Sequence, residues 1–307
     1  MSAQVESRPV EVMTQNLKEH DGRLYNDVQD DYALPADQEE IDRLNSQHRA
    51  LTMLYDSLIP EPIKASLVEQ TNPRILDVGC GTGIWSIEVA EEIPTASVIG
   101  VDLVSIHPKS YPSNVLFQKL DILESFPEGW EGSFDLVHAR YLIAGIRDFS
   151  LLLSRLTKLL KPNGHLIIME PQALWNTVND DIHKTCPSTA QISKIVYDAM
   201  LKLGIDPIPG KRVSEHLKAN VQYDQVETIT KDLPLSPWSS DPRMKEIGQA
   251  HLPVTLTLPG AFRRLTLSSG LIDEEAYDKL VRGSQEEVRK AEGQLIFPVW
   301  LIWARKK

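Results

Sequence analysis

A glycine-rich turn constrains this chain more than any other part of its sequence. The segment 77–83 (DVGCGTG) lies between a short apolar run at 74–78 (RILDV) and a helical pattern at 85–92. Glycine adopts tight turns at little steric cost, and it lets a ligand approach the main-chain amides closely. A strand, a glycine turn and a helix in this order predict a ligand-binding edge of an α/β sheet.

The glycine spacing separates this turn from two common phosphate-binding motifs. The dinucleotide fingerprint G-x-G-x-x-G/A requires glycine or alanine at its last position. This position holds Ile84 when the motif is counted from Gly79, and Ser86 when it is counted from Gly81, so neither count fits. The P-loop pattern G-x-x-x-x-G-K-[ST] is absent from the sequence. The spacing that does fit is D-x-G-x-G-x-G, with Asp77 as the acidic residue at the strand end.

Strand and helix patterns alternate after this turn. The predicted strands lie at 74–78, 98–101, 115–119, 134–138 and 165–169, with helices at 85–92 and 151–160. This alternation predicts a Rossmann-like α/β fold with a doubly wound, mostly parallel sheet of seven strands. Beyond residue 171 the regular order ends. The predicted elements there are helices at 189–203, 213–219 and 274–293 and strands at 226–230 and 297–303. An irregular proline-rich stretch at 234–259 is expected to include a helix at 244–251.

A helical pattern precedes the sheet. Asp37 is a candidate N-cap and Glu40 its capping-box partner, followed by an apolar stripe at helical spacing that includes His48. Pro60 and Pro62 are expected to end this helix. We therefore divide the chain into an N-terminal helical lid segment (1–70), a cofactor-binding core (71–172) and a C-terminal part that completes the sheet and covers the acceptor pocket (173–307).

The D-x-G-x-G-x-G pattern resembles motif I of class I methyltransferases, which use S-adenosylmethionine. The resemblance implies that Asp77 accepts a hydrogen bond from the ammonium group of that ligand, directly or through water. It also implies that Gly79, Cys80, Gly81 and Gly83 form the turn that lies against its methionine portion.

Two further acids follow the next two predicted strands. Asp102 is placed where a carboxylate can accept hydrogen bonds from both ribose hydroxyls, with Leu103 beside it. The resemblance implies that Asp121 bonds the adenine amino group while Ile122 packs on the ring. Acids at the ends of three consecutive strands are a more specific signal for this ligand than any one of them alone.

Further segments resemble fungal LaeA-like methyltransferases over residues 20–307. They are 21–25 (DGRLY), 32–35 (YALP), 40–44 (EIDRL), 83–85 (GIW), 138–140 (HAR), 160–164 (LKPNG) and 245–248 (KEIG). The family often has Thr where this chain has Cys80, which is a tolerated small residue. The resemblance implies a role in fungal secondary metabolism, either as a small-molecule enzyme or as a nuclear regulator. Tyr25 and Tyr32 are candidates for a lid over the cofactor, and packing aromatics account for them equally well.

The candidate catalytic residues follow from where methyl transfer would occur. His138 and Arg140 follow the fourth predicted strand, and Glu170 follows the fifth. A general base is needed only if the acceptor still carries its proton at working pH. Structural readings compete in each case: a backbone hydrogen bond for His138, an internal salt bridge for Arg140, a structural hydrogen bond for Glu170 and core packing for His48.

The composition of the chain bears on which partners and which cellular compartment we expect. The 307 residues carry a net charge of −11, which disfavours nucleic acid as a partner without excluding a local basic pocket. Two cysteines, Cys80 and Cys186, cannot build a disulfide framework or a multi-cysteine metal site, which fits a reducing compartment. No apolar run approaches the ~20 residues that span a bilayer, so we expect a cytoplasmic protein, with a nuclear location as the alternative, and no metal.

Three functions are weighed from the sequence. The first is a methyltransferase that uses S-adenosylmethionine to methylate a small-molecule acceptor at oxygen. The second is a LaeA-like regulatory methyltransferase that acts on or within a protein complex. The third, a Rossmann oxidoreductase, is disfavoured by the missing third glycine and by the placement of Asp77.

Overall fold

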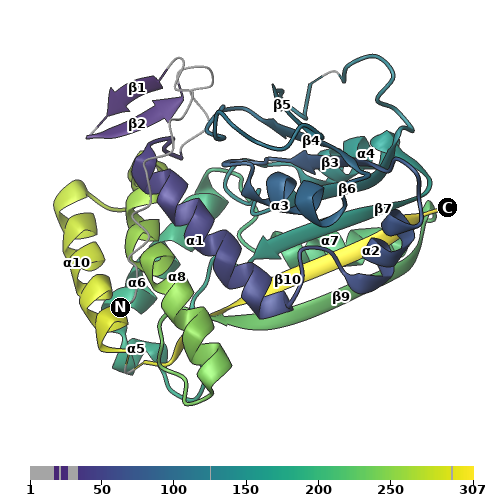
Figure 1. The fold of residues 1–307 in the computed structure, drawn as a ribbon. Helices are drawn as coiled ribbons and strands as arrows, with labels where there is room; N and C mark the ends of the chain where they lie inside the picture. Colours follow the sequence, from purple (N-terminus) through teal and green to yellow (C-terminus); the bar gives the residue numbers. More distant parts are fainter. Residues whose placement is uncertain (1–16, 21, 27–33, 125, 292) are drawn as a thin grey trace, which may run out of the picture.

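A computed structural model describes residues 17–20, 22–26, 34–124, 126–291 and 293–307 (Figure 1). Tyr32 therefore lies outside the described residues. A hairpin of β1 (Leu17–His20) and β2 (Arg23–Asn26) precedes the main body. No helix in the described part of the chain combines the length and apolar character needed to cross a membrane.

The core of the fold is one mixed sheet. Its parallel part has the order β5–β4–β3–β6–β7, and antiparallel β10 then pairs with both β7 and β9. The strands are β3 (Arg74–Val78), β4 (Ser97–Asp102), β5 (Val115–Lys119), β6 (Phe134–Arg140), β7 (Leu160–Pro171), β9 (Tyr223–Pro234) and β10 (Leu295–Lys306). The predicted doubly wound, mostly parallel sheet is confirmed. An eighth strand, β8 (Asn176–Thr177), adds two residues against β10, so the prediction of seven strands omitted this short pairing.

The last strands are longer than their apolar patterns. The predicted strand at 297–303 extends to residue 306, because antiparallel neighbours on both sides supply backbone partners beyond the apolar run. Polar side chains pair at this extension: Arg305 Nε and Nη2 each donate to Asp224 on β9 at 2.9 Å.

Helices cover both faces of the sheet (Figure 1). Ile75 on β3 packs in the core with α1 (Gln38–Tyr55), α2 (Glu61–Val68) and α3 (Ile84–Glu92). The next residue, Leu76, packs on the other face with α4 (Phe149–Leu159) and α7 (Pro209–Ala219). This alternation is the two-residue period of a strand that is buried on both faces.

The N-terminal helix begins as predicted and ends earlier. The Asp37 side chain accepts a hydrogen bond from the Glu40 amide at 3.0 Å, which confirms the N-cap. The helix ends at Tyr55 with Asp56 in the left-handed region, before the two prolines. Pro60 caps α2 and Pro62 lies in its first turn, where proline is favoured, so these prolines begin a helix rather than end one.

The remaining helices pack beside the carboxyl ends of the parallel strands. They are α5 (Ile182–Thr185), α6 (Pro187–Lys202), α8 (Pro242–Ala261), α9 (Arg263–Ser268) and α10 (Glu274–Lys290). The long helix α8 lies along α1 (Figure 1). These two helices come from opposite ends of the sequence, and both contribute residues to the site described below.

Helix α8 extends the helix predicted at 244–251 through most of the stretch at 234–259 that the sequence indicated as irregular. It runs for 20 residues with Pro253 and Pro259 inside it. Asp241 caps its first turn by accepting from the Met244 amide at 2.8 Å. Tyr277 of α10 donates its hydroxyl to the carbonyl of Pro259 at 2.6 Å, within a buried contact. Tertiary packing and these side-chain bonds offset the lost backbone bonds that proline causes.

Candidate active site

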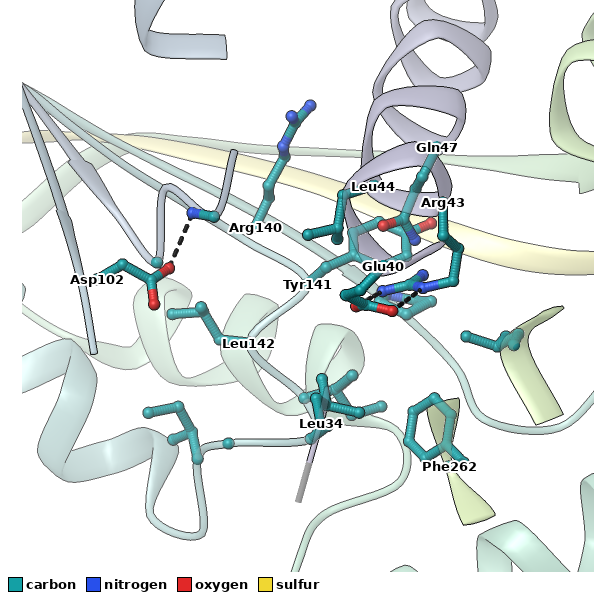
Figure 2. A pocket seen from close by; sticks show the side chains of 18 of the residues that line it. Leu34, Glu40, Arg43, Leu44, Gln47, Asp102, Arg140, Tyr141, Leu142 and Phe262 are labelled. Atoms are coloured by element: carbon teal, nitrogen blue, oxygen red, sulfur yellow. Dashed lines mark hydrogen bonds and ion pairs between the residues drawn. The ribbon is translucent and has the colours of Figure 1, made fainter. Parts of the chain in front are cut away.

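A cavity of about 260 Å³ opens at the carboxyl ends of β3, β4 and β6 (Figure 2). This is where the strand order reverses, which is the usual ligand position in an open α/β sheet. Helix α1 forms one wall (Figure 2). The opposite wall comes from residues in the C-terminal part of the chain, on α6 and α8 and at Phe262 and Phe297.

The glycine turn has the backbone that its sequence predicts. Gly79, Gly81 and Gly83 all have positive φ, at 69°, 53° and 72°. The amides of Gly79 and Cys80 both donate to the carbonyl of Val101, at 2.8 and 3.0 Å, and this fixes the turn on β4. Gly79, Cys80 and Gly81 line the cavity, whereas Gly83 does not. A Cβ atom at Gly83 would instead clash with the ring of Phe117.

Asp102 lines the cavity at the end of β4 (Figure 2). Its Oδ2 accepts from the Gly81 amide at 2.8 Å, and its Oδ1 accepts from the Val104 amide at 3.0 Å. A carboxylate has about four acceptor sites, so both oxygens keep capacity for a ligand. Burial raises the pKa of Asp102 from its usual value, while these amides act in the opposite direction.

Three more of the predicted cofactor residues line the same cavity. They are Leu103, Asp121 and Ile122. Asp121 Oδ1 accepts from the Leu123 amide at 2.8 Å, which holds the turn after β5. Burial raises the pKa of the Cys80 thiol well above its usual value, so this thiol stays protonated. The cavity thus has carboxylates at the end of β4 and after β5, with apolar side chains beside them.

Asp77 lies behind the glycine turn and outside the cavity lining. Its Oδ2 accepts from the Ser86 hydroxyl at 2.6 Å, and its Oδ1 lies 2.8 Å from Nδ1 of His138. His138 also stacks on Trp85, with ring centroids 3.7 Å apart. Burial is the main cause of the lowered pKa of His138, although the contact with Asp77 opposes it. Asp77 and His138 therefore connect β3, β6 and α3 beneath the turn.

His48 and Arg140 meet in a second polar cluster. Arg140 donates Nη2 to His48 Nδ1 at 2.8 Å, while His48 Nε2 lies 2.7 Å from Oε2 of Glu88. Because Nδ1 accepts from Arg140 and Nε2 faces a carboxylate, the proton of the neutral His48 ring is assigned to Nε2. Burial lowers its pKa, which agrees with this assignment. Arg140 lines the cavity, whereas His48 does not.

Glu170 holds the loop that follows β6. It is fully buried, and its two oxygens accept from the amides of Leu142 and Ile143 at 2.8 and 3.1 Å. Burial raises its pKa to about 8. Glu170 does not line the cavity, while Leu142 and Ile143 do.

Tyr25 lies outside the cavity lining. Its ring is buried, and the guanidinium carbon of Arg264 lies 5.3 Å from its centroid. The packing alternative raised from the sequence matches this environment. Tyr32, the other lid candidate, falls outside the described residues.

Sequence reasoning missed the polar residues on the cavity side of α1. Arg43 donates to both oxygens of Glu40, at 2.8 and 2.5 Å, and Gln47 lies one turn further along (Figure 2). Positions 40, 43 and 47 share one face of a helix with Leu44. The sequence signal that could have identified them is the presence of polar residues beside the apolar stripe of this helix. Tyr141, at the end of β6, also lines the cavity and was missed.

The fold and the site together define a class I methyltransferase. The parallel strands, the antiparallel β10 between β7 and β9, and the glycine turn with an acid at the end of the next strand form one consistent set. The family model described as "Methyltransferase domain" matches residues 48–217. The chain belongs to this family, and its methyl donor is S-adenosylmethionine.

The curated proteins that match most of this chain include fungal proteins. The chain is 28% identical to "Methyltransferase str2" of Strobilurus tenacellus, over 79% of this chain and 85% of that protein. It is 31% identical to "Secondary metabolism regulator LAE1" of Cochliobolus heterostrophus, over 78% of each, and 30% identical to the protein of that name in Pyricularia oryzae, over 85% of this chain and 81% of that one. The chain therefore belongs to the LaeA-like methyltransferases. A solved phosphoethanolamine N-methyltransferase 2 from Haemonchus contortus is similar at 20% identity with a TM-score of 0.47, over 92% of this chain and 61% of that one.

Proposed function

We propose that this protein transfers a methyl group from S-adenosylmethionine to an oxygen atom of a small-molecule acceptor in fungal secondary metabolism. The observation that supports this proposal is that one cavity is lined both by the glycine turn with Asp102 and by an apolar wall from the C-terminal part. A donor and a small acceptor can therefore share one enclosed space. We expect this enzyme in the cytoplasm.

The polar and backbone groups that line the cavity fit S-adenosylmethionine. Asp102 would accept from the ribose hydroxyls with its remaining lone pairs, and Gly79 and Gly81 would allow the methionine portion to lie against the backbone. Asp121 would accept from the adenine amino group, with Ile122 packed on the ring. Asp77 would act from behind the turn, by holding Ser86 and His138.

Bound S-adenosylmethionine supplies an electrophilic methyl group, and the chain contributes mainly orientation. Correct alignment of two reactants can contribute up to ~7–11 kcal/mol. Arg140 is the one predicted catalytic residue that lines the cavity, and we infer that it helps to orient the bound donor. We assign positioning roles to His48, through Arg140, and to Glu170, through the loop after β6. His138 supports the turn through Asp77.

Calorimetry tests the cofactor site. S-adenosylhomocysteine should bind, while NAD(H) should not. Asp102→Ala should weaken that binding at least about tenfold, because it removes hydrogen bonds to a charged acceptor. Asp224→Asn, which alters only the surface pair with Arg305, is the matched control and should bind normally. Unchanged affinity in Asp102→Ala would refute the ribose role.

The second candidate function is a regulatory methyltransferase that acts on or within a protein complex, in the nucleus. Relatives at 30% identity favour it by name: "Secondary metabolism regulator laeA" of Aspergillus fumigatus and "Protein-methionine methyltransferase laeA" of Emericella nidulans. A turnover screen with methyl-labelled S-adenosylmethionine and extracts of the source organism separates the two. Label in extractable metabolites supports the small-molecule enzyme, whereas label in protein supports the regulator.

A further inference from the structure

Tyr141 has a strained backbone at the end of β6. Its φ is 55°, in the left-handed region, which is an outlier for a bulky side chain. Three bonds enforce this geometry: the Tyr141 amide donates to the carbonyl of Met169 at 2.8 Å, and the next two amides donate to Glu170. Strain of this kind persists where the surroundings hold it, and such residues cluster at functional sites.

Tyr141 lines the same cavity as Leu142, beside the glycine turn, and Phe262, on the apolar wall. The next residue, Leu142, packs so closely on the glycine turn that a Cβ atom at Gly79 would clash with it. Tyr141 lies beside the face of α1 that carries Glu40 and Gln47 (Figure 2).

The hydroxyl of Tyr141 is buried and has no hydrogen-bond partner within the described part of the chain. An unsatisfied buried hydroxyl costs free energy, and in a ligand cavity it is a group that a ligand can satisfy. Burial also raises the pKa of Tyr141 well above its usual value, so the group remains a neutral phenol. A neutral phenol both donates and accepts, which matches a hydroxyl on the ligand.

The charged groups in the lining do not favour an anionic acceptor. Arg43 is held by a bidentate pair with Glu40, in which both side chains are buried. The guanidinium of Arg140 points away from Tyr141 and Phe262, and it bonds His48 (Figure 2). Asp102 lies at the opposite edge and would repel an anion. A carboxylate near Tyr141 would thus be desolvated without a new ion pair, which is costly.

The rest of the chamber is mostly apolar, although its lining also includes the polar residues Gln172 and Ser193. Its large apolar side chains are Trp175, Met200, Val254, Leu258, Phe262 and Phe297. An acceptor that fills it must therefore bury a largely hydrophobic body.

We propose that the Tyr141 hydroxyl hydrogen-bonds the acceptor, and that the acceptor is an uncharged, mostly apolar alcohol or phenol. This inference rests on the proposed function and names its substrate class. Methylation of that hydroxyl forms a carbon–oxygen bond as the sulfonium carbon–sulfur bond breaks; the bonding pair stays on sulfur, and the hydroxyl proton leaves to water.

A matched pair of probes tests the substrate class. The protein is saturated with S-adenosylhomocysteine and titrated by calorimetry with 2-naphthol and with 2-naphthoate, which differ in charge on the same ring system. We expect 2-naphthol to bind at least about tenfold more tightly, because the carboxylate loses its hydration. Equal or tighter binding of 2-naphthoate, or no binding of 2-naphthol, would overturn the proposal. Failure of S-adenosylhomocysteine to bind would instead contradict the proposed function.

Tyr141→Phe tests the residue. This substitution should weaken the binding of 2-naphthol about tenfold and change the affinity for S-adenosylhomocysteine by no more than about twofold. It should not lower the Tm of the free protein. Tyr55→Phe is the matched control: it removes a hydroxyl that donates to the Val299 carbonyl at 2.7 Å, so it should lower Tm without changing the preference between probes. A Tyr141→Phe variant with a Tm as low as that control, or with unchanged 2-naphthol affinity, would assign the hydroxyl a structural role.

Discussion

At the scale of single residues, Glu170 connects burial, charge and the shape of the site. Its carboxyl group is fully buried, and two consecutive loop amides donate to it. Burial raises its pKa from the usual 4.5 to about 8. Between these values the folded protein retains a proton that the unfolded chain has lost, so stability is lost as pH rises through this window.

Glu170→Gln should remove this pH dependence, because the amide does not titrate. Between pH 5.5 and 8 the wild type should lose on the order of 3 kcal/mol of unfolding free energy through Glu170. Urea unfolding at a series of pH values measures the slope. The variant should show a flatter profile over this range, whatever its absolute stability, while Glu69→Gln on the surface should keep the wild-type slope. An unchanged slope in Glu170→Gln would show that this carboxyl is already ionised throughout the range.

Single residues also show what sequence can and cannot predict. Asp102 and Asp121 line the cavity as expected, because any residue that ends a parallel strand lies at that edge. Asp77 lies one residue before the end of β3, yet its side chain lies beneath the turn, with Ser86 and His138. Whether a side chain at a strand end faces the ligand or the core depends on neighbouring elements, which strand patterns do not specify.

At the scale of elements, the glycine turn is fitted to β5 as well as to a ligand. Gly83→Ala should be strongly destabilising, because the residue has a φ of 72° and its new methyl group would clash with Phe117. Gly129→Ala is a matched control, with a φ of 78° and nothing within 4 Å of the added carbon. The control should cost about 1–2 kcal/mol for the left-handed backbone alone.

The clash should add roughly 1–3 kcal/mol to the cost of Gly83→Ala, as overpacking does elsewhere. Chemical unfolding measures both variants. Combining Gly83→Ala with Phe117→Leu should recover part of the difference, and a double-mutant cycle gives the coupling. If both glycine variants lose the same free energy, the contact between β5 and the turn is not tight.

Elements with a strong local signal were predicted well. The sequence placed β3 and β5 at their observed bounds, because short runs of strand-forming residues between turn residues mark strands, whether buried like β3 or at the sheet edge like β5. Helix α8 was predicted too short, since Pro253 and Pro259 indicate interruption. Only its packing along α1 and the contact from α10 show why the helix continues.

At the scale of the whole molecule, the N-terminal, central and C-terminal parts share one core. Buried residues from α1, from β3 and from β10 belong to the same hydrophobic cluster, and β10 lies between β7 and β9. The cavity is likewise lined from all three parts. We therefore expect one cooperative folding unit, although the sequence divides into three segments by pattern.

Hydrogen exchange measured by mass spectrometry tests this cooperativity. The slowest amides of β3 (Arg74–Val78) and β10 (Leu295–Lys306) should exchange with the same opening free energy, and both should respond equally to added denaturant. Removing β10 would expose the edges of β7 and β9 and much of the shared core, so a partial opening that frees β10 alone is costly. S-adenosylhomocysteine at 100 times its Kd should raise both values by about 2.7 kcal/mol. If β10 opens at lower free energy than β3, or if the ligand protects β3 alone, the C-terminal part folds as a separate unit onto a preformed cofactor core.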